Sequence, residues 1–362
     1  MKEIYEIDPN FAIVEHIEQP GLVWHETNEE GFTIYGLEES GLAMNPQVYR
    51  RIPREVAEQT SEGVLGLHDN TAGGRVRFMT DSPYVAIRVT YRWLCDMPHM
   101  PLTGSSAFDM YQTDENGCNY IKTFTPPWNP QARKNGYEAI CRMKEGKMRD
   151  LTINFPLYNS VESLQIGLAE DAVIEKAPGY RLPDPVVYYG SSITQGGCAS
   201  RPGNAYQGFV SRALDLDQIN LGFSGSGRGE PVMADHIASL KMCAFVLDYD
   251  HNAPDPEHLE KTHYPLYKKV RDAHPDIPIL CVSRPNYDFS NEPADAMRDV
   301  IRATVKRAVE EGDKNIRFLD GETLFGTDFR RDCTVDGAHP NDLGFYRMAQ
   351  AMIPILKEML EL

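Results

Sequence analysis

Apolar and polar side chains alternate along several short stretches in the first half of the chain. The alternation is clear at residues 76–79, 84–93, 151–155 and 161–168. A period of two residues is that of a strand with one buried face. Turn signals such as Asp81-Ser82-Pro83 and Glu115-Asn116-Gly117 separate these stretches. Residues 1–177 are therefore predicted to form an all-β domain, a sandwich of the jelly-roll type.

The pattern changes after residues 178–185, where three prolines and a glycine interrupt both periods. We interpret this segment as a linker, followed by a second domain over residues 186–362. Continuous apolar runs in that domain lie at residues 186–189, 218–221, 244–249, 277–282 and 316–319. Segments of helical period alternate with them, near residues 203–215, 230–240, 256–274, 294–312 and 341–361. This alternation predicts a parallel five-stranded sheet that helices cover on both faces.

Small and polar residues follow the first three predicted strands of the second domain. Ser192 comes after the first strand, Gly225 after the second and Asn252 after the third. Ligands of open parallel sheets bind beyond the carboxyl ends of the strands. The hydroxyl of Ser192 is therefore expected at a rim where it can attack a substrate.

A serine nucleophile needs a base and a group that orients the base. Asp336 stands three residues before His339, in a segment that follows the fifth predicted strand. One short loop can therefore supply both a carboxylate and an imidazole to the same rim. We predict that Ser192 Oγ meets the ring of His339.

Four blocks in the second domain resemble, in their order, the signature of the SGNH (GDSL-like) hydrolase superfamily. They lie at residues 190–192, 220–225, 247–252 and 336–339. The resemblance extends from near Pro183 to Leu362 and implies a flavodoxin-like, three-layer α/β/α domain. In the first half, Ala107-Phe108-Asp109-Met110-Tyr111 looks like the Gly-x-Asp-Leu-Tyr motif of a domain that precedes some SGNH esterases. Alanine and methionine stand there in place of the family's glycine and leucine.

The resemblance implies a role for each block. Ser192 would be the nucleophile, His339 the general base, and Asp336 the carboxylate that holds the imidazole. The oxyanion hole would consist of the backbone N–H groups of Ser192 and Gly225 and the side-chain amide of Asn252.

Two positions depart from the family pattern, and one acidic residue lies beside it. Ser191 stands where the name-giving motif has aspartate, and Asp250-His251 replaces the usual small residue before Asn252. Glu230 follows the second block, residues 220–225, which we call the glycine block, and is a possible pocket residue. A carboxylate at the start of a helix is the interpretation that we favour for it.

The resulting prediction is a serine esterase that removes a short acyl group, acetyl first, by way of an acyl-enzyme. Sandwich-bearing SGNH proteins resemble carbohydrate deacetylases, which implies an acetylated sugar or oligosaccharide as substrate. Trp128, in a proline-rich loop, either stacks on a sugar ring or fills an interdomain contact. The alternatives are an acylhydrolase of the thioesterase or lysophospholipase type, and a carbohydrate-binding protein without catalysis.

Two other kinds of site are alternatives to the serine hydrolase site. Gly225-Ser226-Gly227-Arg228-Gly229 follows a strand, but it lacks the G-x-G-x-x-G spacing of a dinucleotide loop. The stretch from Asp248 to His251 offers ligands for a divalent metal, although hydrolysis by a serine needs none. No cofactor and no metal are therefore expected.

The composition limits the classes of binding partner and the cellular compartment that we expect for this chain. The formal net charge of -17 disfavours nucleic acid and anionic membranes, which bind clustered Lys and Arg. The seven cysteines are scattered without a CxxC, which argues against a disulfide framework or a zinc site. Residues 1–6 lack the features of a signal segment and no apolar run reaches the length of a membrane span, so the chain is expected to be cytoplasmic. The oligomeric state stays open.

The histidines outside the four blocks show no paired spacing. They are interpreted as structural or surface residues: His16, His25, His68, His99, His236, His258, His263 and His274.

Overall fold

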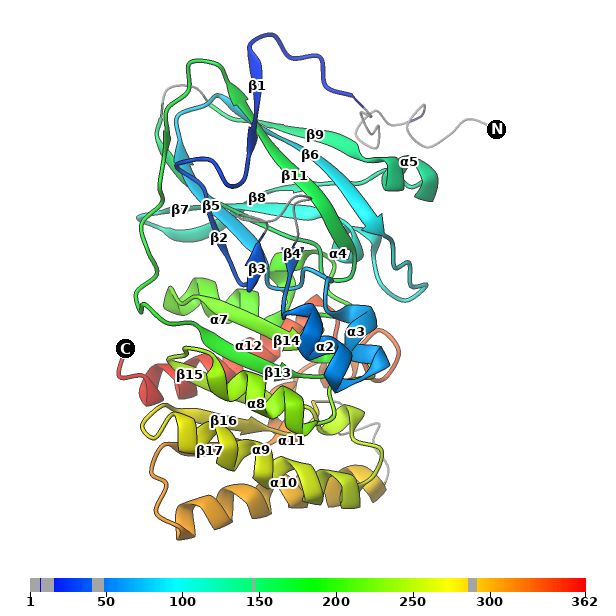
Figure 1. The fold of residues 1–362 in the computed structure, drawn as a ribbon, viewed down its shortest axis with the longest axis vertical. Coiled ribbons are helices and arrows are strands. Elements are labelled where there is room, and N and C mark those ends of the chain that lie inside the picture. The colour runs from blue at the N-terminus through cyan, green and yellow to red at the C-terminus, as the bar shows by residue number, and fades with distance from the viewer. Residues whose placement is uncertain (1–6, 8–15, 41–48, 145–146, 286–291) are drawn as a thin grey trace.

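A β-sandwich stands on an α/β domain in the computed structural model (Figure 1). The structure describes residues 7, 16–40, 49–144, 147–285 and 292–362. Residues 1–6, on which the expectation of a missing signal segment rests, lie outside the described residues. In the described part of the chain, no helix combines the length and the apolar character needed to cross a bilayer.

Two antiparallel sheets form the sandwich and enclose a core of their own. The first sheet has the order β1 (Leu22–Glu26), β11 (Ser160–Ala169), β6 (Tyr84–Trp93) and β9 (Tyr137–Arg142). The second has the order β12 (Ile174–Glu175), β5 (Arg75–Thr80), β10 (Arg149–Asn154), β7 (Phe108–Asp114) and β8 (Gly117–Phe124), with β2 (Thr33–Tyr35) also beside β5. Alternate residues such as Val85, Ile87 and Phe78 are fully buried between the sheets, which confirms the predicted sandwich.

Short helices interrupt the strands of the first half, where the sequence predicts only β-structure. They are α2 (Arg54–Thr60), α3 (Glu62–Leu67), α4 (Leu102–Ser105) and α5 (Pro130–Asn135), and β3 (Glu39–Ser40) and β4 (Tyr49–Arg50) form a separate small sheet. With seven and six residues, α2 and α3 are too short to display an amphipathic period. Ala57 and Val64 of these helices join the core of the second domain.

The second domain contains the predicted parallel sheet of five strands. Their order is β14 (Gln218–Gly222), β13 (Val186–Gly190), β15 (Ala244–Asp248), β16 (Ile279–Val282) and β17 (Ile316–Leu319). This order places the first strand second from the edge, as in flavodoxin-like folds. The carboxyl ends of β13, β14 and β15 therefore meet, with Gly190 opposite both Gly222 and Asp248.

Helices cover both faces of this sheet. On one face Tyr188 and Val246 pack with α7 (Tyr206–Leu214) and α12 (Asp342–Met359). On the other, Val187 and Phe245 pack with α8 (Pro231–Ser239), α9 (Pro256–Ala273) and α10 (Glu292–Glu310). The short elements are α6 (Ser192–Gln195), α11 (Gly321–Leu324) and the 3-10 turns η2 (Pro202–Asn204), η3 (Asp250–Asn252) and η5 (Arg330–Asp332). The three-layer fold class is thereby confirmed.

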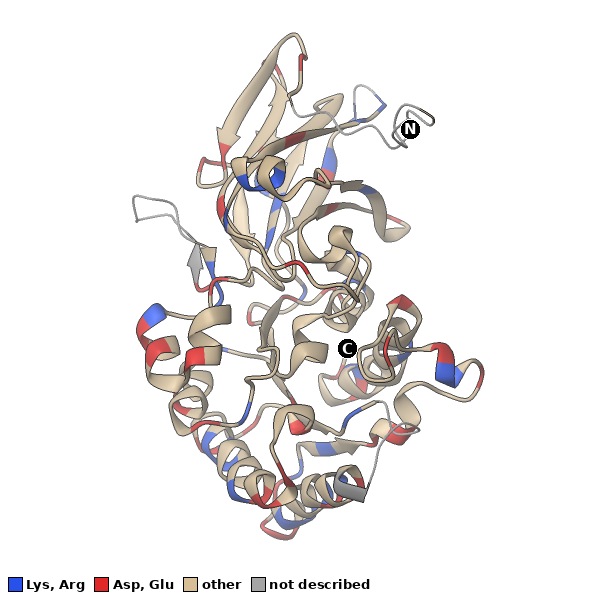
Figure 2. Cartoon of the chain, turned by 90° about the vertical axis from the view of Figure 1, so that its right-hand side faces the viewer, with Lys and Arg blue, Asp and Glu red and all other residues tan. Residues whose placement is uncertain are grey.

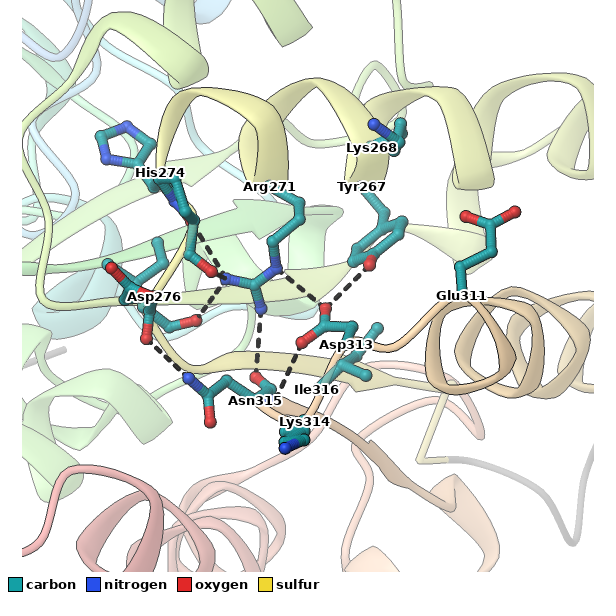
Figure 3. A network of polar contacts seen from close by, with 12 residues as sticks. Tyr267, Lys268, Arg271, His274, Asp276, Glu311, Asp313, Lys314, Asn315 and Ile316 are labelled. Atoms are coloured by element: carbon teal, nitrogen blue, oxygen red, sulfur yellow. Dashed lines mark hydrogen bonds and ion pairs between the residues drawn. The ribbon is translucent and has the colours of Figure 1, made fainter.

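Figure 3 shows a polar network that ties together the amino ends of β16 and β17. Arg271 donates from Nε to the carboxylate of Asp313 at 2.8 Å, and Tyr267 donates to the same carboxylate at 2.7 Å. The guanidinium also donates to the backbone carbonyls of His274, Pro275, Ile277 and Asn315. This network fixes the amino ends of these strands, at the end of the sheet opposite to Ser192.

Basic and acidic residues are interspersed along the outer helices of the second domain (Figure 2). Several form pairs one helical turn apart, such as Lys261 with Glu257 on α9 and Lys306 with Glu310 on α10. Exposed pairs of this kind contribute little to stability.

Asp109 of the Gly-x-Asp-Leu-Tyr-like motif joins the two domains. Its buried carboxylate accepts hydrogen bonds from Asn154 Nδ2 at 2.8 Å, the backbone N–H of Gly203 at 2.9 Å and Arg201 Nη1 at 3.2 Å. Tyr111 of the same motif also contacts the Arg201 guanidinium. The motif therefore holds the segment that follows α6.

Candidate active site

Strand β13 ends in a turn that only glycine can make. A Cβ on Gly190 would lie 2.0 Å from Thr194 Oγ1 and 2.1 Å from the carbonyl oxygen of Asp248. The chain enters helix α6 directly afterwards, and Ser191 Oγ accepts a hydrogen bond from the N–H of Ile193 at 3.2 Å. Ser191 therefore supplies the cap that a carboxylate would supply at this position. Ser192 is the first residue of α6.

Ser192, His339 and Asp336 form a continuous chain of hydrogen bonds. Ser192 Oγ lies 2.9 Å from His339 Nε2, and His339 Nδ1 lies 2.8 Å from Asp336 Oδ2. Ser192 is buried at 7% exposure, whereas the side chains of His339 and Asp336 are 25% and 35% exposed. Solvent therefore reaches the imidazole and the carboxylate, whereas the serine is buried.

The loop that carries Asp336 is shaped around its own carboxylate. Asp336 Oδ1 accepts hydrogen bonds from the backbone N–H groups of Ala338 at 3.0 Å and His339 at 2.7 Å. Gly337 has a φ of 84°, which lets the chain turn back so tightly. Partial burial alone would raise the pKa of Asp336, but these hydrogen bonds and the contact with His339 lower it to about 2. The carboxylate is therefore ionised at neutral pH and can stabilise an imidazolium.

The glycine block presents backbone donors next to Ser192. Gln195 Oε1 accepts from the N–H of Ser224 at 2.9 Å, which fixes the loop after β14. Gly225 adopts a φ of 68°. Among the described residues, the N–H groups of Ser192 and Gly225 have no hydrogen-bond acceptor. Two donors are thus left for a ligand.

Asn252 reaches the same loop from η3. Its Nδ2 donates to the carbonyl oxygen of Phe223 at 2.9 Å, so one amide hydrogen is engaged by the protein. The same carbonyl accepts from the N–H groups of Ser226 and Gly227. Asn252 therefore connects the third block to the second.

Glu230 and Trp128 lie in other surroundings. Glu230 precedes α8, but its carboxylate accepts from the hydroxyl of Tyr189 at 3.1 Å instead of from the helix. Trp128 is 82% exposed on the loop before α5. The structure records no contact between either residue and Ser192 or His339.

Asp248 and Asp250 are buried and bound by protein groups. Asp248 Oδ2 accepts from the hydroxyls of Tyr206 at 3.1 Å and Thr194 at 3.3 Å. Burial, with the nearby Asp250, raises the pKa of Asp248 well above its ordinary value. Asp250 Oδ2 lies 3.3 Å from the guanidinium of Arg284. These two side chains therefore connect the end of β15 to the neighbouring segments of the protein.

Arg51 holds the backbone of the glycine block by hydrogen bonds, a role that the sequence did not indicate. This fully buried side chain donates to the backbone carbonyls of Leu67, Asn70, Asn220 and Gly222. Its guanidinium also lies 4.5 Å from the ring centroid of Phe223. The first half of the chain thus holds the end of β14 in place.

His99 and Cys198 also belong to the surroundings of the triad. The ring centroids of His99 and His339 are 5.3 Å apart, so His99, which the sequence assigns to the structural or surface histidines, lies beside the triad. The backbone N–H of Cys198 donates to the carbonyl of Pro340 at 3.2 Å. Spacing along the sequence could not find either residue, because His99 is 240 positions and Cys198 is 141 positions from His339.

Two family models match the chain. Residues 183–357 match the GDSL-like lipase/acylhydrolase family, and residues 22–174 match the N-terminus of SGNH-hydrolase-type esterases, the GxDLY domain. No curated protein matches the chain.

Several solved structures share the whole fold. A GDSL-like lipase from Bacteroides ovatus has 28% identity and a TM-score of 0.82, covering 94% of this chain and 98% of its own. The salicylyl-acyltransferase SsfX3 of a tetracycline biosynthetic pathway has 19% identity and a TM-score of 0.76, covering 92% and 96%. A family two carbohydrate esterase from Clostridium thermocellum, in complex with cellohexaose, has 15% identity and a TM-score of 0.58, covering 80% and 93%.

Proposed function

Because the chain belongs to the GDSL-like lipase/acylhydrolase family and carries the N-terminal domain of SGNH-type esterases, we propose that it is a serine esterase that removes a short acyl group, acetyl first, from a carbohydrate hydroxyl. The observation that carries the proposal is the separation of 2.9 Å between Ser192 Oγ and His339 Nε2. Asp336 at 2.8 Å from the other ring nitrogen completes the set of groups that such a reaction needs.

The reaction proceeds in two halves. Ser192 Oγ bonds to the carbonyl carbon of the ester while its proton moves to His339 Nε2, giving a tetrahedral oxyanion. The carbon–oxygen bond to the alcohol then breaks, and the alcohol leaves with the proton from His339. Water, deprotonated by His339, next attacks the acyl-Ser192, and the carboxylic acid departs as the serine regains its proton. Asp336 stays ionised throughout and stabilises the imidazolium.

The oxyanion is bound by the backbone N–H groups of Ser192 and Gly225, which have no acceptor in the described part of the chain. Asn252 contributes its second amide hydrogen, because the first is engaged by the carbonyl of Phe223. Donors fixed before the reaction stabilise charge that develops in the transition state, and losing one typically costs about 10²–10³-fold in rate.

Two observations support a short acyl group on a sugar. Ser192 is only 7% exposed, which leaves little room for a long chain next to its oxygen. The carbohydrate esterase of family two that shares this fold was solved with cellohexaose. The imidazole of His339, 25% exposed, is accessible to a polar alcohol such as a sugar.

A fluorophosphonate label tests the nucleophile. The label reacts with an activated serine, so we expect it to modify the wild-type chain and not Ser192→Ala. Equal labelling of both chains would refute Ser192 as nucleophile. No labelling of a folded wild-type chain would favour the carbohydrate-binding protein without catalysis.

Chain-length preference tests the acyl group. We expect the wild-type chain to hydrolyse p-nitrophenyl acetate faster than p-nitrophenyl octanoate, and to release acetate from acetylated saccharides. A higher rate on octanoate would favour the thioesterase or lysophospholipase type instead.

A further inference from the structure

Three side chains that bind transition metals converge beside Ser192. His99, Cys198 and His339 each present a ring nitrogen or a thiol sulfur, and these atoms all lie within 4.8 Å of one another. Within the residues that the structure describes, no other group of three His, Cys, Asp or Glu side chains meets the same criterion. Cys198 is buried, whereas the two histidines are partly exposed, so the group is reachable from solvent.

The ligand types point to Zn²⁺. Imidazole nitrogen and thiolate sulfur are zinc ligands, and three protein ligands leave the fourth tetrahedral position to water, whereas Mg²⁺ and Ca²⁺ prefer oxygen ligands. Zinc bonds of about 2.0–2.3 Å place tetrahedral ligands roughly 3.5 Å apart. Atoms that are at most 4.8 Å apart therefore need to approach one another by up to about 1.3 Å.

The supports of a metal site are already present around these ligands. His339 Nδ1 is bonded to Asp336 Oδ2 at 2.8 Å, which leaves Nε2 as the nitrogen for a metal. A carboxylate behind a histidine is the usual outer partner of zinc ligands. The backbone bond from Cys198 to Pro340 ties the thiol to the histidine loop.

The third ligand comes from the sandwich domain and is also anchored. Near His99, Met100 is buried in the core of the second domain, and the N–H of Cys95 donates to Asn159 Oδ1 at 2.8 Å. Asp96 in the same segment pairs with the buried Arg133, at 2.6 Å. The segment is thus held from both sides of His99.

We propose that His99, Cys198 and His339 form an inhibitory Zn²⁺ site. As the Zn–S bond forms, the thiol of Cys198 releases its proton to the solvent. The ion also occupies the lone pair of His339 Nε2, which then cannot accept the proton of Ser192. Binding itself needs only the three ligands; the inhibitory consequence rests on the proposed function.

Cobalt binding to the Ser192→Ala variant tests the site without any need for activity. This variant keeps all three ligands, and Co²⁺ reports thiolate ligation through a charge-transfer absorption band. We expect one Co²⁺ per chain with that band, and we expect Zn²⁺ to displace it. The band should vanish when Cys198→Ser is added and persist with Cys243→Ser, a control at the opposite end of the sheet. Absence of the band in Ser192→Ala, or its survival in Cys198→Ser, would overturn the proposal.

Inhibition of ester hydrolysis tests the consequence. We expect Zn²⁺ to inhibit the wild-type chain on p-nitrophenyl acetate, Mg²⁺ to have no effect, and EDTA to restore the rate. Loss of an outer partner alone weakens metal binding by roughly 10–100-fold, so Cys198→Ser should need more than about 10-fold more Zn²⁺ for half inhibition. Equal sensitivity of Cys198→Ser and the wild type would refute the site. A chain that binds Co²⁺ with the thiolate band but hydrolyses no ester in EDTA would instead count against the proposed function.

Discussion

Asp336 uses its two carboxylate oxygens for different partners. Oδ1 accepts from the backbone of its own loop, and Oδ2 binds His339 Nδ1 at 2.8 Å. In Asp336→Asn, an amide nitrogen facing the ring would favour the wrong tautomer of His339. We therefore expect kcat to fall by about 10³–10⁴-fold. Steady-state hydrolysis of p-nitrophenyl acetate measures this, with Asp332→Asn, an exposed carboxylate of the same segment, as the control that keeps its rate.

The pKa of Asp336 also predicts how stability depends on pH. Its pKa falls from an ordinary 3.8 to about 2 in the folded chain. A carboxylate with a lowered folded pKa stabilises the protein above its unfolded pKa, and this contribution is lost as pH falls through the folded value. The difference in free energy of unfolding between the wild type and Asp336→Asn should therefore be full above about pH 5 and roughly halved at pH 3. Urea unfolding at both pH values checks this, and an unchanged difference would contradict it.

The positions of single residues were predictable only where the residue stands in a local pattern. Ser192, Asp336 and His339 follow predicted strands, so their shared rim could be inferred. His99, Cys198 and Arg51 stand in no such pattern, because their contacts join positions that are far apart in the chain. Only the tertiary fold brings these residues to the site.

At the scale of elements, β14 depends on an arginine from outside its own domain. Arg51 donates to the carbonyl oxygens of Asn220 and Gly222 in the buried second half of the strand. Lysine keeps the charge but cannot reproduce the fork of guanidinium donors. We expect Arg51→Lys to lower the free energy of unfolding by about 3 kcal/mol and to reduce kcat, because the glycine block loses its support. Unfolding and kinetics together check this. Wild-type values for both would show that Arg51 has no such role.

Strand positions followed from the sequence because continuous apolar runs mark buried parallel strands. Four of the five observed strands agree with their predictions to within one residue at each end. The exception, β16, begins at Ile279 instead of residue 277, because Pro278 has no N–H to donate to a neighbouring strand. Helices α2 and α3 escaped prediction because fewer than two turns cannot show a period.

At the scale of the whole molecule, Asp109 is the centre of the contact between the domains. Every group that binds its carboxylate is a donor, including Arg201 and the N–H of Gly203. With asparagine at this position, the amide nitrogen, itself a donor, would face one of these donors. We expect Asp109→Asn to lower the free energy of unfolding by about 3 kcal/mol and to lower kcat/KM, because the displaced segment follows the nucleophile helix.

A matched variant separates that effect from general destabilisation. Arg271→Ala breaks a buried ion pair at the opposite edge of the sheet (Figure 3). It should cost a similar free energy of unfolding, about 3 kcal/mol, and leave kcat/KM unchanged at a temperature where both variants are folded. Equal losses of kcat/KM in the two variants would show that the contact at Asp109 does not position the site.

Trapping of the acyl-enzyme is the most direct test of Ser192 as the nucleophile. The chain is mixed with p-nitrophenyl acetate, quenched in acid within the first turnover and digested, and the peptides are weighed by mass spectrometry. We expect one acetyl group per chain on the peptide that contains Ser192, and none there in Ser192→Ala. Ester hydrolysis that continues at the wild-type rate in Ser192→Ala, or an acetyl group that accumulates on another residue, would contradict it.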